Sequence, residues 1–241
     1  FLYSTEENMS LPSALSWLRL PIVAAPMFLV SGVDLVVSAC QSGVVGTFPA
    51  LNQRTTEGFS AWLDDIKARL AAYDENNPER PAAPYGVNLI VHRSNPRVQA
   101  DLEVCVEKQV PLVITSLGAR EEVNEAVHSY GGIVLHDVIN NKFAKKAIEK
   151  GADGLIAVAA GAGGHAGTLS PFALIREIRE WFDGPLLLSG SIAHGSGVLA
   201  AQAMGADLAY IGSAFIATEE ANAEQAYKQM IVESNADDIV Y

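Results

Sequence analysis

One histidine, His165, stands in the segment GAGGHAG, where every neighbour is glycine or alanine. Neighbours this small leave the imidazole unshielded and let a planar ligand come close to the backbone. An imidazole titrates near neutral pH, so it can accept or donate a proton in general acid–base catalysis beside a cofactor. A lone histidine is more often structural, but a core histidine needs no cage of glycines. We therefore predict that His165 is the catalytic residue.

Glycines also gather in two later segments, residues 190–197 and 212–213. Glycine lets backbone N–H groups approach an anion, and a helix that follows adds the positive end of its dipole. Either segment alone could be only a tight turn, whereas the two together predict a phosphate site. No GxGxxG or GxxxxGK[ST] pattern stands between a strand and a helix, so neither a Rossmann site nor a P-loop is indicated.

Other chemically useful side chains follow apolar runs. Met27 comes after Ala25 and Pro26, and its thioether could pack against an aromatic ring or simply fill the core. The amide of Asn88 is costly to bury without partners, so it could bind the edge of a heterocycle through one donor and one acceptor. His136 could line the same pocket or only satisfy its neighbours.

Several other kinds of site are not indicated. No pair of carboxylates suggests a glycosidase, and no HExxH motif or histidine–carboxylate cluster suggests a metal, so we expect none. Cys40 and Cys105 lack CxxC spacing. A nucleophile and base pair of Ser189 and His165 would lack both a nucleophile elbow and a third partner.

The elements that must position these residues form a regular series. Eight short, apolar, β-branched runs alternate with amphipathic stretches, which is the pattern of repeated βα units with a parallel sheet. The expected strands are 22–26, 44–48, 85–90, 112–115, 133–136, 154–158, 185–189 and 208–212. From Ile22 to Ile211 is 189 positions, or 27 for each of seven steps, close to the roughly 250 residues of eight units in a TIM barrel. We predict an α/β fold of this type, a TIM (β/α)8 barrel, with its active site at the carboxyl ends of the strands.

The tripeptide Gly-Ala-Asp occurs twice, at residues 151–153 and 205–207, each time after a helical stretch and before a strand. A glycine there accepts the left-handed conformation that ends a helix, so the repeat predicts a reused structural turn. We expect the barrel to occupy residues 1–218 and a C-terminal helical segment to occupy residues 219–241, with a helix over 219–233.

Composition limits the possible partners. The 241 residues, 49% of them hydrophobic, can fill one large core. A net charge of −12 repels phosphate backbones, so we expect no nucleic acid. No apolar stretch reaches the roughly 20 residues that cross a bilayer. Residues 1–10 show no secretory signal and the cysteines suggest no disulfide framework, so we expect a cytoplasmic protein. A small-molecule partner fits best, and a homodimer is left open.

Five segments together resemble the nitronate monooxygenase family, also called the 2-nitropropane dioxygenase-like flavoproteins: PIVAAPM, GVNL, AGAGGHAGTLSP, LSGSIAHG and GADLAYIGSAFIAT. The similarity runs from Pro21 to about Tyr241. It implies a TIM barrel that binds FMN, with Met27 near the isoalloxazine, Asn88 hydrogen-bonded to the flavin and His165 as the catalytic histidine. The cofactor-binding residues expected in all are Ala25, Pro26, Met27, Asn88, His136, Ala160, Gly163, Gly164, Ser189, Gly190, Ser191, Gly212 and Ser213.

The resemblance implies oxidation of an alkyl nitronate or nitroalkane by O2, with a carbonyl compound and nitrite as products. Two alternatives stay open: an FMN-dependent enoyl-acyl-carrier-protein reductase that uses a nicotinamide cofactor, and a non-catalytic flavin-binding barrel. Many relatives carry an acidic residue where Gly161 stands, and Gly-Gly-Ile where Gly190-Ser191-Ile192 stands. Family members also continue past the barrel, so we expect residues 219–241 to begin a lid.

Overall fold

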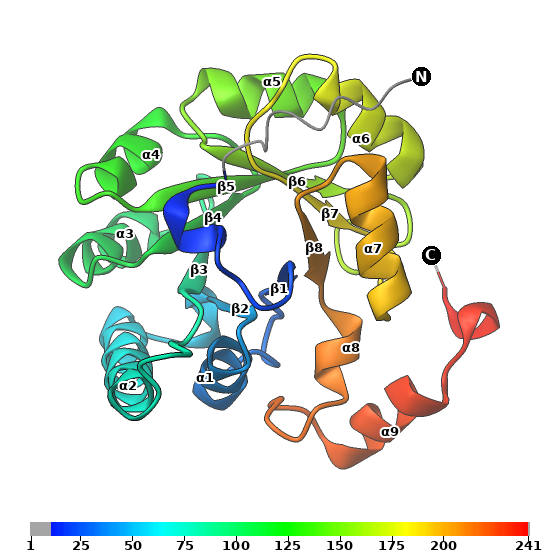
Figure 1. Cartoon of the computed structure of the whole chain (residues 1–241). Coiled ribbons are helices and arrows are strands. Elements are labelled where there is room, and N and C mark those ends of the chain that lie inside the picture. The colour runs from blue at the N-terminus through cyan, green and yellow to red at the C-terminus, as the bar shows by residue number, and fades with distance from the viewer. Residues whose placement is uncertain (1–10, 241) are drawn as a thin grey trace.

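The computed structural model describes residues 11–240 and shows a closed barrel of eight parallel strands. Each strand pairs with the next along the chain, and β8 pairs with β1. Figure 1 looks along the barrel, with the helices in a ring outside it. The predicted TIM barrel is confirmed, and the predictions for residues 1–10 lie outside the described residues.

The strands coincide closely with the apolar runs of the sequence. They are β1 (Ile22–Ala24), β2 (Val45–Pro49), β3 (Tyr85–Ile90), β4 (Leu112–Ser116), β5 (Ile133–Val138), β6 (Gly154–Val158), β7 (Leu186–Ser189) and β8 (Leu208–Ile211). β3 and β6 have the expected bounds, and the other six differ by one or two residues at one or both ends. β1 stops before Pro26, which has no N–H to donate to a ladder.

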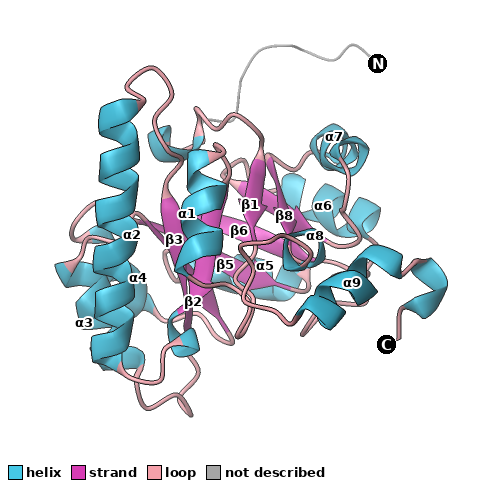
Figure 2. Ribbon diagram, turned by 90° about the horizontal axis from the view of Figure 1, so that it is seen from below, coloured by secondary structure: helices cyan, strands magenta, loops and turns pink. Residues whose placement is uncertain are grey.

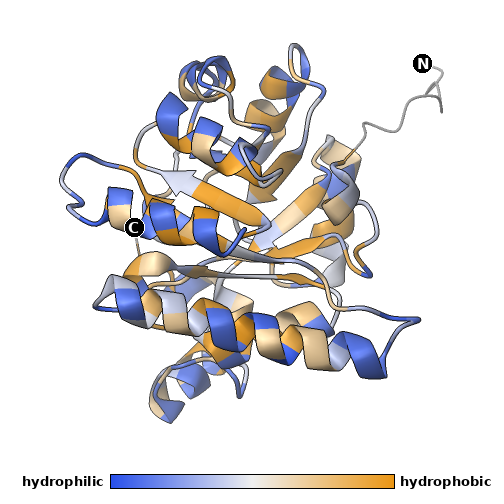
Figure 3. Ribbon diagram, turned by 90° about the vertical axis from the view of Figure 1, so that its left-hand side faces the viewer, coloured by the Kyte–Doolittle hydropathy of each residue, from blue (hydrophilic) through white to orange (hydrophobic). Residues whose placement is uncertain are grey.

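Helices follow the strands and cover the outside of the barrel. They are α1 (Val33–Gln41), α2 (Thr56–Asn76), α3 (Val98–Glu107), α4 (Glu121–His128), α5 (Asn141–Glu149), α6 (Pro171–Arg179), α7 (Gly195–Met204), α8 (Ser213–Ile216) and α9 (Gln225–Glu233). Figure 3 shows the apolar strands inside and hydrophilic residues along the outer helices. Among residues 11–240, no helix is both long and apolar enough to cross a bilayer.

Side chains that alternate along each strand fill the inside of the barrel. The interior cluster contains Val23, Val45, Leu112, Ile114, Leu135, Ile156, Leu187 and Leu208. Leu15, from the 3-10 turn η1 (Ser13–Leu15), joins this cluster and covers the amino end of the strands. The residues between them, such as Val113 and Val134, pack against the helices instead. Because a strand alternates between its two faces, a polar residue two positions after an interior residue also faces inward, at the barrel mouth.

The two Gly-Ala-Asp tripeptides make the same turn before two different strands. Each glycine has a positive φ, 89° and 110°, where it follows its helix. Asp153 then accepts the N–H of Val134 at 2.7 Å, and Asp207 accepts the N–H of Leu186 at 2.8 Å. Asp207 also pairs with Arg179 at 2.8 Å. The repeat is therefore a structural turn, as predicted, that ties each αβ connection to the start of the preceding strand.

The predicted helix over 219–233 is wrong at its start. The structure has a helix only from Gln225, as α9. The preceding stretch is held by tertiary hydrogen bonds: the Asn222 backbone N–H donates to the Val30 carbonyl, and its side-chain amide donates to the Leu29 carbonyl, both at 2.9 Å. A backbone used in this way cannot also close helical turns.

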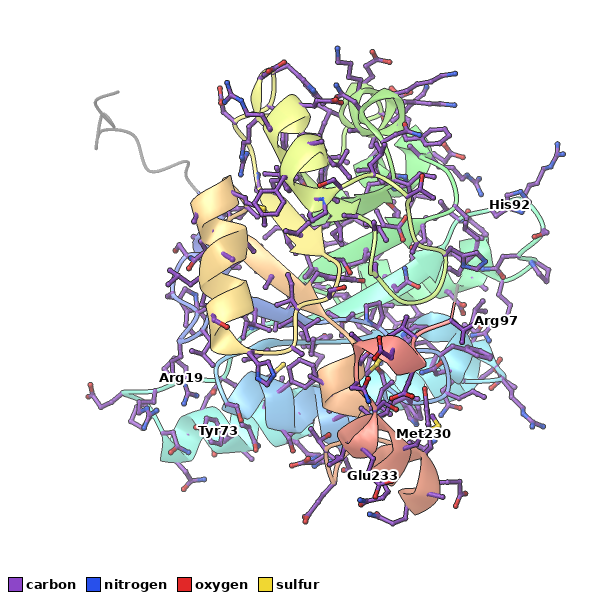
Figure 4. All side chains as sticks on the ribbon, turned by 90° about the vertical axis from the view of Figure 1, so that its right-hand side faces the viewer. Arg19, Tyr73, His92, Arg97, Met230 and Glu233 are labelled. Carbon is purple, nitrogen blue, oxygen red and sulfur yellow. The ribbon has the colours of Figure 1, made fainter. Side chains whose placement is uncertain are left out.

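α9 lies at the periphery of the molecule, beyond α8 (Figures 1 and 2). Figure 4 shows Met230 and Glu233 on this helix, and none of its residues is buried. The boundary at residues 218–219 and the lid role of the segment that follows stay predictions.

Candidate active site

The ends of β1 and β8 lie side by side at the barrel mouth. Ala24 pairs with Ile211, and the N–H of Ala25 donates to the Ile211 carbonyl at 2.8 Å. A Cβ built on Gly212 would stand 3.6 Å from the sulfur of Met27 and 3.8 Å from the Cβ of Ala25. The structure therefore brings together Ala25, Met27 and Gly212, three of the residues predicted to bind the cofactor.

Two polar side chains that sequence reasoning missed hold Met27 in place. The hydroxyl of Ser31 accepts the Met27 N–H at 2.9 Å, and the Asn52 amide donates to the carbonyls of Met27 at 3.1 Å and Ser31 at 2.8 Å. Ser31 is fully buried. Asn52 comes from the turn after β2, so the loop after β1 is braced by its neighbour in the barrel.

The loops after β6 and β7 are joined directly. The Ser191 N–H donates to the Gly161 carbonyl at 3.0 Å. Gly190 has a φ of 145°, and a Cβ there would stand 2.7 Å from the carbonyl oxygen of Ala160. Ala160, Gly190 and Ser191 are therefore adjacent, next to Ser189 at the end of β7. The N–H of Ser191 is already used, so it is not free to bind a phosphate.

His165 stands in the most open part of the β6 loop. Its side chain is exposed and makes no hydrogen bond to any residue between 11 and 240. A Cβ on Gly163 or Gly164 would meet nothing within 4 Å. The glycines therefore leave free space beside the imidazole, as the sequence predicted for a group that receives a ligand.

Unpaired backbone donors follow the β7 loop. The N–H groups of Ile192, Ala193 and His194 find no acceptor within the described part of the chain. They lead into α7, whose first residue, Gly195, has open space where a Cβ would stand. Free N–H groups at the positive end of a helix bind anions, so this turn has the features of a phosphate cradle.

Asn88 belongs to a hydrogen-bonded network at the mouth. It is 6% exposed, and its amide nitrogen donates to the Ile114 carbonyl at 3.1 Å and the Ser116 hydroxyl at 2.8 Å. The Ser116 hydroxyl donates in turn to Asp137 at 2.5 Å. Both amide hydrogens of Asn88 are therefore occupied. Only its oxygen is left for a ligand, not the donor and acceptor that the sequence suggested.

Asp137 is a residue that sequence reasoning missed. It stands two positions after Leu135 of the interior cluster, so it faces the mouth from β5. Burial raises the pKa of its carboxyl to about 6, although the Ser116 hydrogen bond and the charge of His165 both lower it. No cation in residues 11–240 lies within ion-pair distance of it. The alternation of β5 was the signal that could have found it.

His136, by contrast, is not brought to the mouth, which corrects its place in the predicted cofactor set. It lies between the outward-facing Val134 and Val138, and its Nδ1 is 2.6 Å from the hydroxyl of Thr115. Burial lowers the pKa of this imidazole to about 4, so it is neutral at pH 7. The expected strand ended at His136, whereas β5 continues to Val138 with a fixed alternation.

The other three histidines lie elsewhere. His92 is exposed in the connection after β3 and points away from the barrel (Figure 4). His128 pairs with Asp153 at 2.9 Å, and His194 is exposed before α7. Ser189 and His165 are not hydrogen-bonded to each other within the described residues.

Among residues 11–240, no group of three His, Cys, Asp or Glu side chains is arranged to hold a metal ion. Cys40 and Cys105 are buried and free, and burial raises the pKa of the Cys40 thiol to about 12 and that of Cys105 further. Thiols in this state are poor nucleophiles.

The model of one protein family, described as nitronate monooxygenase, matches residues 10–241. The chain belongs to this family. The nitronate monooxygenase of Neurospora crassa is 26% identical over 89% of this chain and 64% of its own. A Rhodococcus jostii protein, named (3aS,4S,5R,7aS)-5-hydroxy-7a-methyl-1-oxo-octahydro-1H-indene-4-carboxyl-CoA dehydrogenase, is 26% identical over 86% of this chain and 55% of its own. The chain thus spans between about half and two thirds of these relatives.

Solved structures agree with the family. The nitroalkane oxidase of Streptomyces ansochromogenes is 26% identical, with a TM-score of 0.79 over 90% of this chain and 72% of its own. FabK from Thermotoga maritima is 24% identical, with a TM-score of 0.81 over 94% of this chain and 68% of its own, and shows the fold alone.

Nitronate monooxygenases are flavin-dependent oxidoreductases, so a flavin is the group to test against this site. The free N–H groups at residues 192–194 suit its phosphate. The open Cα positions of Gly163 and Gly164 leave space for a planar ring, and the side-chain oxygen of Asn88, which has no partner among residues 11–240, can accept an N–H from one. The residues present therefore fit a flavin.

Proposed function

We propose that the protein binds FMN at the barrel mouth and oxidises alkyl nitronates, and nitroalkanes after deprotonation, with O2 to a carbonyl compound and nitrite. The observation that carries this proposal is the exposed imidazole of His165 in an open glycine loop. The backbone of this loop, at Gly161, is hydrogen-bonded to the turn after β7 that has the free N–H groups. Membership of the nitronate monooxygenase family supports it. FMN, when bound, accepts the electrons of the substrate.

Each residue at the mouth has a task in this proposal. The turn from Ser189 through Gly190 to α7 holds the phosphate, with Gly212 and Ser213 beside it. Ala25, Pro26 and Met27 form one wall of the ring site, because the Met27 sulfur lies over Gly212. Asn88 accepts a hydrogen bond from the ring. Ala160, Gly163 and Gly164 keep the opposite side open to the substrate, and the Ser191 bond to Gly161 fixes that loop.

His165 handles the proton. Its imidazole removes the α-proton of a neutral nitroalkane, so that the C–H bond breaks and an N–H bond forms on the ring. For a nitronate, which has already lost this proton, the same imidazole donates a hydrogen bond to a nitro oxygen. The net charge of −12 does not attract such an anion, so local donors must hold it.

A second candidate is oxidation or reduction of a neutral acyl compound. Asp137 favours it, because an unpaired carboxylate at the mouth opposes an anionic nitronate. The Rhodococcus jostii relative is named as a dehydrogenase of a CoA-linked acid. The two free cysteines suit a reducing compartment, so we propose the cytoplasm for either activity.

The test begins with the cofactor released from purified protein on denaturation. We expect FMN at about one per chain. Oxygen uptake is then followed with propionate 3-nitronate and a neutral nitroalkane, and NADH consumption is followed without any nitro compound. Nitronate-dependent oxygen uptake with nitrite release supports the first candidate. NADH oxidation without a nitro compound, and no nitrite, would instead support a reductase.

A further inference from the structure

The carboxyl group of Asp137 is held at the barrel mouth by side chains of the neighbouring strands. Ser116 directly follows Thr115, which pairs with His136 in the β4–β5 ladder, and the Ser116 hydroxyl donates to one carboxyl oxygen of Asp137 at 2.5 Å. Asn88 supplies the hydrogen that keeps the Ser116 hydroxyl turned this way. The second carboxyl oxygen receives no hydrogen bond from residues 11–240, so it is free to meet a ligand.

The groups that face Asp137 do not neutralise its charge. His165 in the β6 loop affects it electrostatically but lies beyond ion-pair distance. Tyr210 faces it from β8, and burial together with Asp137 raises the pKa of that phenol, so the phenol stays neutral. A substrate next to His165 therefore also lies in the field of an uncompensated carboxylate, where unlike charges attract and like charges repel strongly.

We propose that Asp137 is a specificity-determining residue of this site: as a carboxylate it excludes anionic substrates, and in its protonated form it admits them and donates a hydrogen bond to one of their oxygens. This inference rests on the proposed function, because it assigns Asp137 to the same pocket. Neutral substrates enter in either state. The burial that raises the pKa of Asp137 to about 6 places the change within the range of ordinary assays.

The test is the binding of propionate, an inert carboxylate similar in shape to a small nitronate, to FMN-loaded protein. Binding is followed by the change in flavin absorbance and by calorimetry between pH 5 and pH 8. In the parent, the Kd of propionate should rise at least about tenfold over this range, because a tenfold change accompanies each pH unit above the pKa of the required acid. In Asp137→Asn the Kd should vary much less, and at pH 8 it should be lower than in the parent.

A pH effect that arises elsewhere at the mouth can be told apart from that of Asp137. It would change propionate binding equally in the parent and in Asp137→Asn. If Asp137→Asn keeps the whole pH dependence and binds no more tightly at pH 8, the proposal is overturned. Absence of propionate binding to the parent at pH 5 would overturn it as well, since protonated Asp137 has no charge to repel the anion.

Two further variants complete the design. Asp183→Asn removes the same charge from an exposed position before β7, at the opposite end of the barrel, and should behave as the parent. Ser116→Ala serves if Asp137→Asn does not fold. The Ser116 hydrogen bond lowers the pKa of Asp137, so its removal should raise the pH at which propionate binding is lost. If propionate binding to Ser116→Ala is lost at the same pH as in the parent, or at a lower pH, the proposal is contradicted.

The outcome separates this inference from the proposed function. Binding of propionate that depends on pH through Asp137, without any turnover of nitronates, would refute nitronate oxidation and leave the role of Asp137 intact. Turnover of nitronates, together with a propionate Kd that is the same in Asp137→Asn and the parent, would support nitronate oxidation and refute the role of Asp137.

Discussion

The carbonyl oxygen of Gly161 accepts the backbone N–H of Ser191 at 3.0 Å, which ties the loop that carries His165 to the loop that leads into the phosphate cradle. A Cβ on Gly161 would overlap the Ser191 hydroxyl, so the two loops touch. The residue proposed as the proton acceptor and the turn proposed to bind the phosphate are thus held in one unit at the ends of β6 and β7.

Gly190→Val should lower the flavin content of the protein. The φ of 145° disfavours any side chain, and a Cβ would meet the Ala160 carbonyl oxygen at 2.7 Å, so the β7 loop must move. The measurement is the ratio of flavin to protein after purification in the presence of FMN. Gly32→Ala, where a Cβ meets nothing within 4 Å, is the matched control. A folded Gly190→Val protein with full flavin content would refute the proposal that the turn after β7 binds the flavin phosphate.

Asn88→Ala should weaken both the fold and flavin binding. It leaves the Ile114 carbonyl without its donor in a buried position, at a cost of about 1–3 kcal/mol. It also removes the oxygen proposed to accept from the ring, so the Kd of FMN should rise about tenfold. Ser116→Ala disturbs the same network but keeps that oxygen. Equal FMN affinities for the two variants, from fluorescence titration, would speak against a ring contact for Asn88.

His136→Asn should change how stability depends on pH. The folded-state pKa of His136, about 4, lies below the ordinary 6.5, so the unfolded chain binds the proton first as the pH falls. The parent therefore loses about 3 kcal/mol from this group between pH 7 and pH 4, and the variant does not. Asp137 has the opposite effect, since its folded-state pKa is raised, but it acts equally in both proteins. Urea unfolding of the pair at several pH values should show the difference. Parallel curves would mean that His136 is not buried as a neutral group.

The two Gly-Ala-Asp turns should differ in strength. Asp207 and Arg179 have side chains that are 14% and 10% exposed, whereas Asp153 and His128 are more than a third exposed. Asp207→Ala leaves a nearly buried cation without its carboxylate and should cost about 3 kcal/mol, against about 1 kcal/mol for Asp153→Ala. Neither residue touches the mouth, so kcat should not change. Similar losses of unfolding free energy in the two variants would contradict this ranking.

The barrel could be predicted because its strands are local features of the sequence. Each is a short apolar run, and eight of them at a mean spacing of 27 residues leave few other architectures. The rule that active sites form at the carboxyl ends of strands then selects His165 and the glycines after β7 and β8. The prediction for Asn88 rests on a different argument, because a buried amide needs partners.

The features that were missed depend on contacts between distant segments. A strand end misplaced by two residues assigned the mouth to His136 instead of Asp137, since neighbours on a strand face opposite sides. Asn52 braces the loop after β1 across 25 residues of sequence, and no local pattern marks it. Asn222 donates a hydrogen bond to Leu29 across 193 residues of sequence, and this contact keeps the segment from residue 219 from being helical.

The most direct measurement is the anaerobic reduction of bound flavin by a neutral nitroalkane, compared in the parent and His165→Asn. His165 makes no hydrogen bond to residues 11–240, so the variant should keep its flavin and unfold within about 0.5 kcal/mol of the parent. If His165 removes the α-proton, flavin reduction should slow by about 100-fold or more, and the preformed nitronate should lose far less. Equal rates of flavin reduction by the neutral nitroalkane in the two proteins would show that His165 is not the base.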